Sequence, residues 1–221
     1  MKQARTYKLV LFALSASVSA FGATLFSDLG PGGTYDSLDA YVACGSGVCN
    51  GNSFAAAALF AVAGSGSQAV SQIDIVAYDL AAPPPETFTA SIWTDSSGIP
   101  GTELTGASWN FVPPTTQNGL VSITGISGLS LTGGSQYFLV VVPGSLSGNA
   151  YLEWWANNQG STGLMLYSEN GGSWISEPFA EAAFDVQGTP EPAPCVFLAA
   201  GLAIILARRK VGTREEHFRL F

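Results

Sequence analysis

The chain has 221 residues, enough for one domain or two small ones, and 47% of them are hydrophobic, so a sizeable core is expected. Only 11% are charged, and the 26 glycines and 12 prolines exclude a coiled coil and favour an all-β chain rich in turns. All eight basic residues lie near the two ends, so the stretch from Leu9 to Ala207 holds fourteen carboxylates and no lysine or arginine. Nucleic acid is excluded as a partner of this stretch, because phosphate binding requires clustered cations.

Residues 1–23 have the features of a secretory signal peptide. A basic start precedes an apolar run over residues 9–23, and small residues place the cleavage site after Ala20 or Ala23. The apolar run is shorter than the roughly 20 residues of a full membrane span. A removed signal is therefore favoured over a membrane anchor.

Cys44 and Cys49 enclose the short segment Gly-Ser-Gly-Val and are expected to form a disulfide after export. The glycines make so small a ring feasible. Because the ring constrains few residues, its stabilisation is expected at the low end of about 0–5 kcal/mol. A reactive thiol pair is the alternative, but no cation is near to lower a thiol pKa. The third cysteine, Cys195, is expected to be an inert buried thiol.

Residues 24–188 are expected to form one domain of short strands separated by turn residues. The segment 87–93 alternates between apolar and polar residues, as a half-buried strand does. The segment 137–142 is a continuous β-branched and aromatic run, which predicts a strand buried on both faces. An antiparallel β-sandwich or jelly roll fits this pattern. Strands are expected at 53–62, 72–80, 87–93, 103–111, 119–124, 137–142, 150–156, 162–168 and 182–188.

One stretch of this domain also resembles a known class. From Ser91 to Leu104 the chain has a strand, a tryptophan, a small polar turn and then Gly-Ile-Pro-Gly. This is similar to an element of the choice-of-anchor class of bacterial surface domains, and the segments 128–141 and 183–188 follow the same plan. The resemblance implies a β-sandwich fold and an extracellular location, and it implies no chemistry.

Few catalytic arrangements are open to the exported domain. The only histidine is His217, close to the C-terminus, so the domain has no imidazole for a Ser-His-Asp or Cys-His triad or for His-ligated zinc. The catalytic arrangement that these exclusions leave open is a pair of carboxylates, as in glycoside hydrolases. Solvated surface carboxylates are nevertheless the default in so acidic a domain, and no catalytic residue is assigned. The carboxylates weighed for a pair are Glu153, Glu169, Glu177 and Glu181.

Calcium is the one cofactor for which the sequence offers candidate ligands. Carboxylates without neighbouring cations favour a hard divalent ion. Asp36, Asp39, Asn50 and Asn52 gather near the cysteines, and Asp95 adjoins a Ser-Ser-Gly turn. No Asp-x-Asp-x-Asp-Gly loop is present, so diffuse binding of counter-ions is favoured over a specific site and no metal ligand is assigned.

All five tryptophans lie in the exported domain, and the adjacent Trp154 and Trp155 are the candidates for a platform that stacks on sugar rings. Neighbours on a strand point to opposite faces, which favours exposure of one of the two. The alternative is that tryptophan fills the core, and for any single tryptophan this alternative is favoured.

The C-terminal part of the chain predicts a membrane segment. A proline-rich linker, 189–194, precedes an apolar run over residues 195–207. As a helix this run spans about 20 Å, short of a bilayer core of about 30 Å, and extra turns or bilayer thinning would make up the difference. Residues 195–210 are thus expected to be a short transmembrane helix with its basic cluster, and 211–221 a cytoplasmic tail. The basic cluster consists of Arg208, Arg209 and Lys210.

This order of Pro-Glu-Pro, one apolar helix and a basic cluster resembles the PEP-CTERM protein-sorting signal of Gram-negative bacteria. The resemblance implies that Pro190, Glu191 and Pro192 are the recognition motif. It also implies a processing partner, the transpeptidase-like membrane enzyme exosortase, which would remove the helix. The chain departs from the family by continuing through 211–221. A single-span anchor with a proline stalk is the alternative.

Three functions of different classes follow. The preferred one is an exported, non-enzymatic protein of the cell surface or of an exopolysaccharide or biofilm matrix. It would cross the inner membrane, exist first as a membrane-anchored precursor and then reach the surface or the medium. The second is a carbohydrate-binding module that uses an exposed tryptophan. The third is an extracellular glycoside hydrolase.

Overall fold

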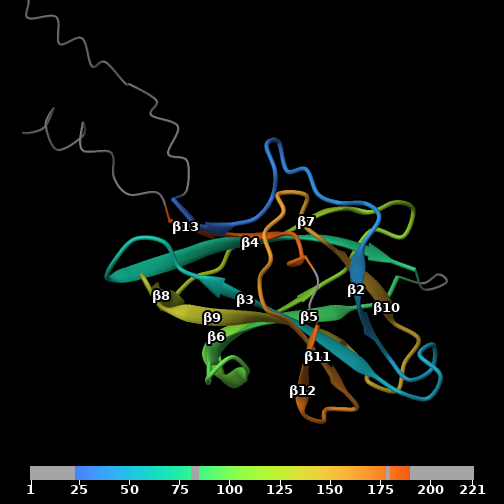
Figure 1. Cartoon of the computed structure of the whole chain (residues 1–221). Helices are drawn as coiled ribbons and strands as arrows, with labels where there is room; N and C mark the ends of the chain where they lie inside the picture. Colours follow the sequence, from blue (N-terminus) through green and yellow to red (C-terminus); the bar gives the residue numbers. More distant parts are fainter. Residues whose placement is uncertain (1–22, 81–84, 178–179, 190–221) are drawn as a thin grey trace, which may run out of the picture. The chain divides into compact units, whose positions relative to one another are not determined.

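A computed structural model describes residues 23–80, 85–177 and 180–189 (Figure 1). These residues form one compact unit. Its regular structure consists of strands, and the described residues contain no helix. The strands are β1 (Thr24–Ser27), β2 (Ala40–Cys44), β3 (Phe54–Ala61), β4 (Ser67–Asp79), β5 (Phe88–Asp95), β6 (Pro100–Phe111), β7 (Gly119–Thr124), β8 (Ser130–Thr132), β9 (Gln136–Pro143), β10 (Tyr151–Trp155), β11 (Met165–Glu169), β12 (Trp174–Glu177) and β13 (Phe184–Gly188).

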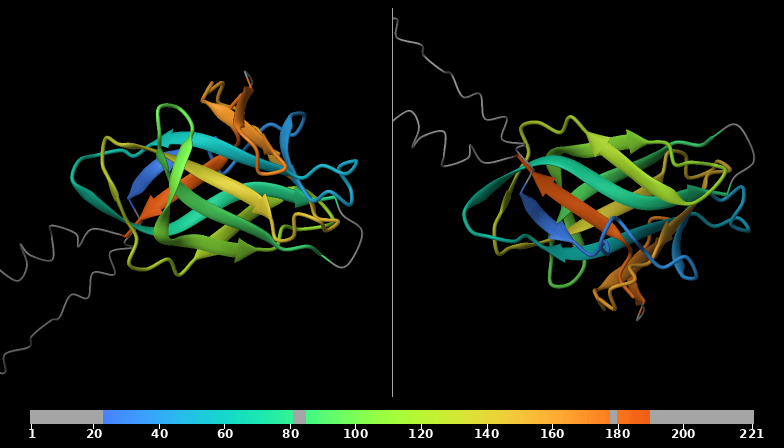
Figure 2. Two further views of the ribbon diagram at one scale, coloured as in Figure 1. Left: turned by 90° about the horizontal axis from the view of Figure 1, so that it is seen from below. Right: turned by 90° about the horizontal axis from the view of Figure 1, so that it is seen from above.

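The strands join into one antiparallel sheet that folds back over itself. Its order is β1-β13-β4-β10-β2-β3-β9-β5-β6, with β7 and β8 beside β4 and the β11–β12 hairpin beside β3. Strands β1, β13 and β4 form one layer, which faces a second layer of β3, β9 and β5 (Figures 1 and 2). The predicted all-β, antiparallel architecture is confirmed, and the two facing layers make it sandwich-like.

The core lies between the two layers and is dominated by aromatic rings. Phe60 of β3 contacts Phe26 of β1 and Phe184 of β13, with ring centroids 5.6 and 5.7 Å apart. Trp154 of β10 meets Phe184 edge-on, with the centroids 5.6 Å apart. Rings packed at these separations add to the stabilisation from burial. The core therefore joins strands from both ends of the described chain.

The two strongest strand patterns of the sequence are found as predicted. Phe88, Ala90 and Ile92 of β5 are fully buried and alternate with more polar neighbours. In β9 the residues from Phe138 to Val141 are all buried, as expected for a strand covered on both faces.

Four short strands, β1, β2, β8 and β12, have no counterpart among the predicted ones, and β4 begins five residues before the predicted 72–80. Each of the four has only three to five residues, too few for an alternating pattern to stand out. They are fixed by their partners instead: β1 pairs with β13, and β8 with the unpredicted start of β4. These pairings join segments that are far apart in the sequence, so no local sequence pattern predicts the short strands.

Candidate functional site

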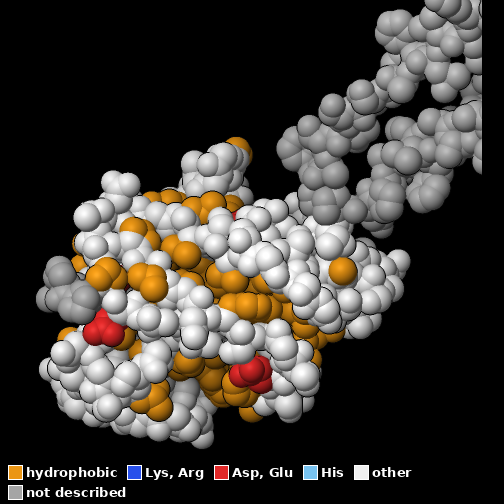
Figure 3. Space-filling view, turned by 180° about the vertical axis from the view of Figure 1, so that it is seen from behind, with side chains coloured by type: hydrophobic (Ala, Val, Ile, Leu, Met, Phe, Trp, Pro, Cys, Tyr) orange, Lys and Arg blue, Asp and Glu red, His pale blue; other side chains and the backbone are white. Residues whose placement is uncertain are grey.

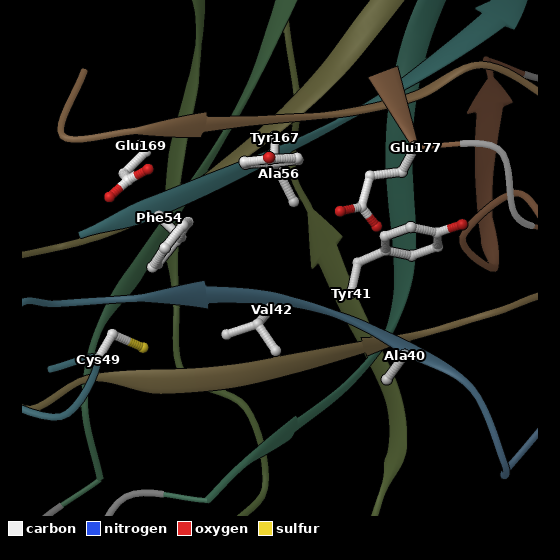
Figure 4. Close-up of a pocket in the computed structure, with 9 residues that line it drawn as sticks. All are labelled: Ala40, Tyr41, Val42, Cys49, Phe54, Ala56, Tyr167, Glu169 and Glu177. Carbon is white, nitrogen blue, oxygen red and sulfur yellow. The ribbon is translucent and has the colours of Figure 1, made fainter. Parts of the chain in front are cut away.

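A groove with a volume of about 500 Å³ opens between β2 on one side and β11 and β12 on the other (Figure 4). Its size falls in the range of small-molecule binding sites, about 300–1,000 Å³. Strands β2, β3, β11 and β12 supply eight of the nine lining residues, and Cys49 supplies the last. The lining residues are Ala40, Tyr41, Val42, Cys49, Phe54, Ala56, Tyr167, Glu169 and Glu177.

The groove exists because β2 and β3 separate after a single paired position. Cys44 of β2 pairs with Phe54 of β3, and no further pair joins these two strands. Along the rest of this edge β3 pairs with β11, where Ala56 lies opposite Tyr167 and Phe54 opposite Glu169. The β11–β12 hairpin thus takes the place that β2 would have continued to occupy, and the space between them stays open.

Three aromatic rings line the groove. Phe54 and Tyr167 are half-buried, with centroids 6.2 Å apart and planes inclined by 49°. Tyr41 is 9% exposed, and its hydroxyl donates a hydrogen bond to the carbonyl of Ala180. Ala56 lies beside Tyr167 and adds only a methyl group to the lining (Figure 4). The faces of aromatic rings stack on flat apolar surfaces of a ligand.

Two carboxylates stand at the groove, Glu169 at one end and Glu177 beside Tyr41 (Figure 4). Burial raises the pKa of the Tyr41 hydroxyl, and the negative charge of Glu177 raises it further. Tyr41 is therefore a neutral hydrogen-bond donor throughout the physiological range. Glu169 is exposed and Glu177 half-buried, so both can accept hydrogen bonds from a ligand.

The turn between β11 and β12 positions the Tyr167 side of the groove. Asn170 and Gly171 both have positive φ, 53° and 67°, as a tight hairpin turn requires. The Asn170 side chain accepts a hydrogen bond from the amide of Ser53 at 2.8 Å and donates one to Asn52 at 3.0 Å. These bonds connect the hairpin to the loop that precedes Phe54.

The opposite wall includes a disulfide. Cys44 and Cys49 are bonded, with their Cα atoms 6.3 Å apart, which confirms the predicted pair. The amides of Val48 and Cys49 both donate to the carbonyl of Gly45, so the enclosed loop is a compact turn. Because Cys49 lines the groove, the disulfide fixes this wall as well as the loop.

Of the two tryptophans predicted as a platform, only Trp154 requires a correction. Trp154 is fully buried, and its indole N–H donates to the carbonyl of Ala183 at 3.1 Å. It cannot stack on a sugar, because β10 lies within the sheet and turns this face to the core. Trp155 is half-buried, and its indole nitrogen is buried without a hydrogen-bond partner among the described residues. Neither residue lines the groove.

The four glutamates weighed for catalysis are distributed over the domain. Glu169 and Glu177 share the groove. Glu153 is half-buried on β10, and burial raises its pKa. Glu181 is 5% exposed and lies outside the groove lining. The structure therefore brings two of the four together.

Two of the five residues considered for calcium accept hydrogen bonds from nearby backbone amides. Asp36 accepts a hydrogen bond from the amide of Leu38 at 2.9 Å, and Asp95 accepts one from Gly98 at 2.7 Å. Among residues 23–80, 85–177 and 180–189, no group of three or more His, Cys, Asp or Glu side chains is placed to hold a metal ion. Asp39 belongs to no such group. Asn50 has a positive φ of 55°, and Asn52 accepts a hydrogen bond from the Asn170 side chain at 3.0 Å.

The predicted segments at the two ends lie outside the described residues, except Ala23 and Thr189. This applies to the signal peptide, the motif Pro190, Glu191 and Pro192, and the helix with Arg208, Arg209 and Lys210. Among the described residues, no helix has the length and apolar character needed to span a membrane. No protein-family model matches the chain, and no match was found among curated proteins.

Proposed function

We propose that the chain is an exported, non-enzymatic protein of the cell surface or extracellular matrix whose β domain binds a polysaccharide. The observation that carries this proposal is the groove between β2 and the β11–β12 hairpin, with three aromatic rings and two carboxylates. Pyranose rings have apolar C–H faces that stack on aromatic side chains, while their hydroxyls donate to carboxylates. The groove has both features.

The route to the surface is the second part of the proposal. The sorting-signal resemblance supports processing at Pro190, Glu191 and Pro192 by an exosortase-type enzyme. The disulfide supports an oxidising compartment, because such bonds persist mainly outside the cytoplasm. The resemblance over Ser91 to Leu104 supports the choice-of-anchor-like assignment of the domain, and the facing layers support its sandwich-like fold.

Mass spectrometry of the protein recovered from the native envelope and medium tests the sorting step. We expect a product that begins after Ala20 or Ala23 and ends near the Pro-Glu-Pro motif. Peptides that extend to Phe221 in the mature protein would contradict processing and would favour the single-span anchor.

Replacing Tyr167 with alanine tests the groove. We expect the dissociation constant for a bound glycan to rise about tenfold or more, because one ring face is worth about 1–2 kcal/mol. A panel of neutral, amine-bearing and acidic oligosaccharides, measured by calorimetry, provides the ligand. Tyr151→Ala is the matched control, since Tyr151 is a half-buried β10 tyrosine outside the groove. Equal losses in the two variants would contradict a binding role for the groove.

Glycoside hydrolysis is the second candidate, favoured by one observation. Glu169 and Glu177 lie in the same groove, and two carboxylates that flank a sugar are the usual apparatus for this reaction. Sugar release that is lost in Glu177→Gln while binding persists would establish this function. Binding without release supports the non-enzymatic proposal.

A further inference from the structure

The charges of the groove are all negative. The side-chain carboxylates of Glu169 and Glu177 receive no hydrogen bond from any described residue, although the domain forms many side-chain bonds elsewhere. The described residues include thirteen Asp and Glu and no lysine, arginine or histidine, so none of them supplies a cation to either glutamate. On the face shown in Figure 3 the charged side chains are likewise acidic only. A ligand that carries a cation would complement the charge of this groove.

The aromatic rings favour the same kind of ligand. The faces of tyrosine and phenylalanine carry negative potential, and an ammonium group over such a face gains about 0.5–2 kcal/mol. Glu177 lies beside the Tyr41 ring, and Glu169 is paired in register with Phe54. Each carboxylate thus adjoins a ring, and an ammonium placed there would meet both.

We infer that the groove binds a glycan with free amino groups, such as a polymer of de-acetylated amino sugars; this inference rests on the proposed polysaccharide binding. The sugar rings stack on Phe54 and Tyr167, and the ammonium groups form charge-assisted hydrogen bonds with Glu169 and Glu177. An acidic glycan is repelled by the two glutamates of the groove. A neutral glycan stacks but leaves both carboxylates without a cation.

The test compares two oligomers that differ only at the amine. The full-length chain is titrated with a glucosamine hexamer and with an N-acetylglucosamine hexamer at about pH 6, where the sugar amine is charged. We expect the glucosamine hexamer to bind about tenfold or more tightly, and this advantage to shrink as salt rises from about 0.05 to 0.5 M. Equal affinity for the two oligomers would overturn the inference and leave polysaccharide binding intact. If neither binds, both proposals fail.

Two variants and one competitor show where the preference arises. In Glu169→Gln/Glu177→Gln the advantage of the glucosamine hexamer should disappear, whereas binding of the acetylated hexamer persists. Glu103→Gln, on the exposed part of β6, is the matched control and should keep the advantage. An oligolysine peptide that binds as tightly as the amino glycan would overturn the inference, because charge alone would then explain binding. A preference that survives in the double variant would overturn it as well.

Discussion

Replacing Trp154 with alanine is expected to lower the free energy of unfolding by about 3–5 kcal/mol, a large part of the stability of a typical domain. The side chain is fully buried in the main core cluster and packs on Phe184. Its loss leaves a cavity that the two layers cannot close, because both are held by paired strands. The carbonyl of Ala183 also loses the indole hydrogen bond. Urea unfolding at equilibrium measures the change.

Trp155 is the matched control because it follows Trp154 on the same strand and points to the other face. It is half-buried, and its indole nitrogen has no hydrogen-bond partner among the described residues. Trp155→Phe is therefore expected to change stability by less than about 1 kcal/mol, since it removes a buried unpaired donor. A larger loss in Trp155→Phe than in Trp154→Ala would show that the roles of the two residues are reversed.

Raising the pH from about 4 to about 8 is expected to destabilise the domain, because two buried carboxyl groups lose their protons over this range. Burial raises the pKa of Asp28 to about 7; hydrogen bonds from the Phe184 amide and from its own backbone oppose the rise, and the charge of Asp185 adds to it. Burial, and then the charge of Asp28, raises the pKa of Glu181 to about 8.

The surroundings of Asp28 and Glu181 explain why the negative charge of neither carboxylate would be fully stabilised. Asp28 accepts a hydrogen bond from the amide of Phe184 at 2.8 Å through Oδ1, but its Oδ2 is buried without a partner among the described residues. The same is true of Oε1 of Glu181. A Cβ at Gly163 would collide with the Glu181 carboxyl group, so this group fills a closed space. Ionisation there places a charge in a buried site where no described residue supplies a cation.

The direction of the pH dependence follows from proton uptake. In the unfolded chain both groups have a pKa near 4. Between about pH 4 and about pH 8 the folded state holds more protons than the unfolded state, so stability is greatest below about pH 4 and declines as the pH rises through 7 and 8. Since one pKa unit corresponds to about 1.4 kcal/mol, each of the two groups contributes a decline on the order of 4 kcal/mol.

Urea unfolding at about pH 5 and about pH 8 tests this expectation. In Asp28→Asn and Glu181→Gln the dependence should flatten, because each removes one titrating group while it keeps the shape of the side chain. Glu103→Gln, which changes an exposed carboxylate, should follow the parent protein. A parent protein that gains stability toward pH 8 would contradict the account.

Local patterns were enough to predict the fold class. The alternation in β5 and the continuous apolar run of β9 depend on neighbours in the chain, and both segments have the predicted burial. Adjacent tryptophans predict opposite faces, but a period of two does not say which face is the core. That depends on the position of β10 between β2 and β4, which is a tertiary property.

The groove could not be predicted in the same way. Tyr41, Phe54 and Tyr167 come from three strands, and their proximity depends on the pairing of β11 with β3. One local signal was present: the turn at Asn170 and Gly171 marked the hairpin that carries Tyr167. The hydrogen bonds from Asn170 to Asn52 and Ser53 link segments far apart in the sequence, so no spacing pattern reveals them.

The most direct test of the central claim is to locate the bound glycan on the isotope-labelled protein by amide chemical-shift mapping. The oligosaccharide that binds most tightly in the panel serves as the ligand. The account predicts that the shifts concentrate at residues 40–42, 54–56 and 167–169, which border the groove. Shifts confined to another face of the domain, or no shifts with any oligosaccharide, would contradict it.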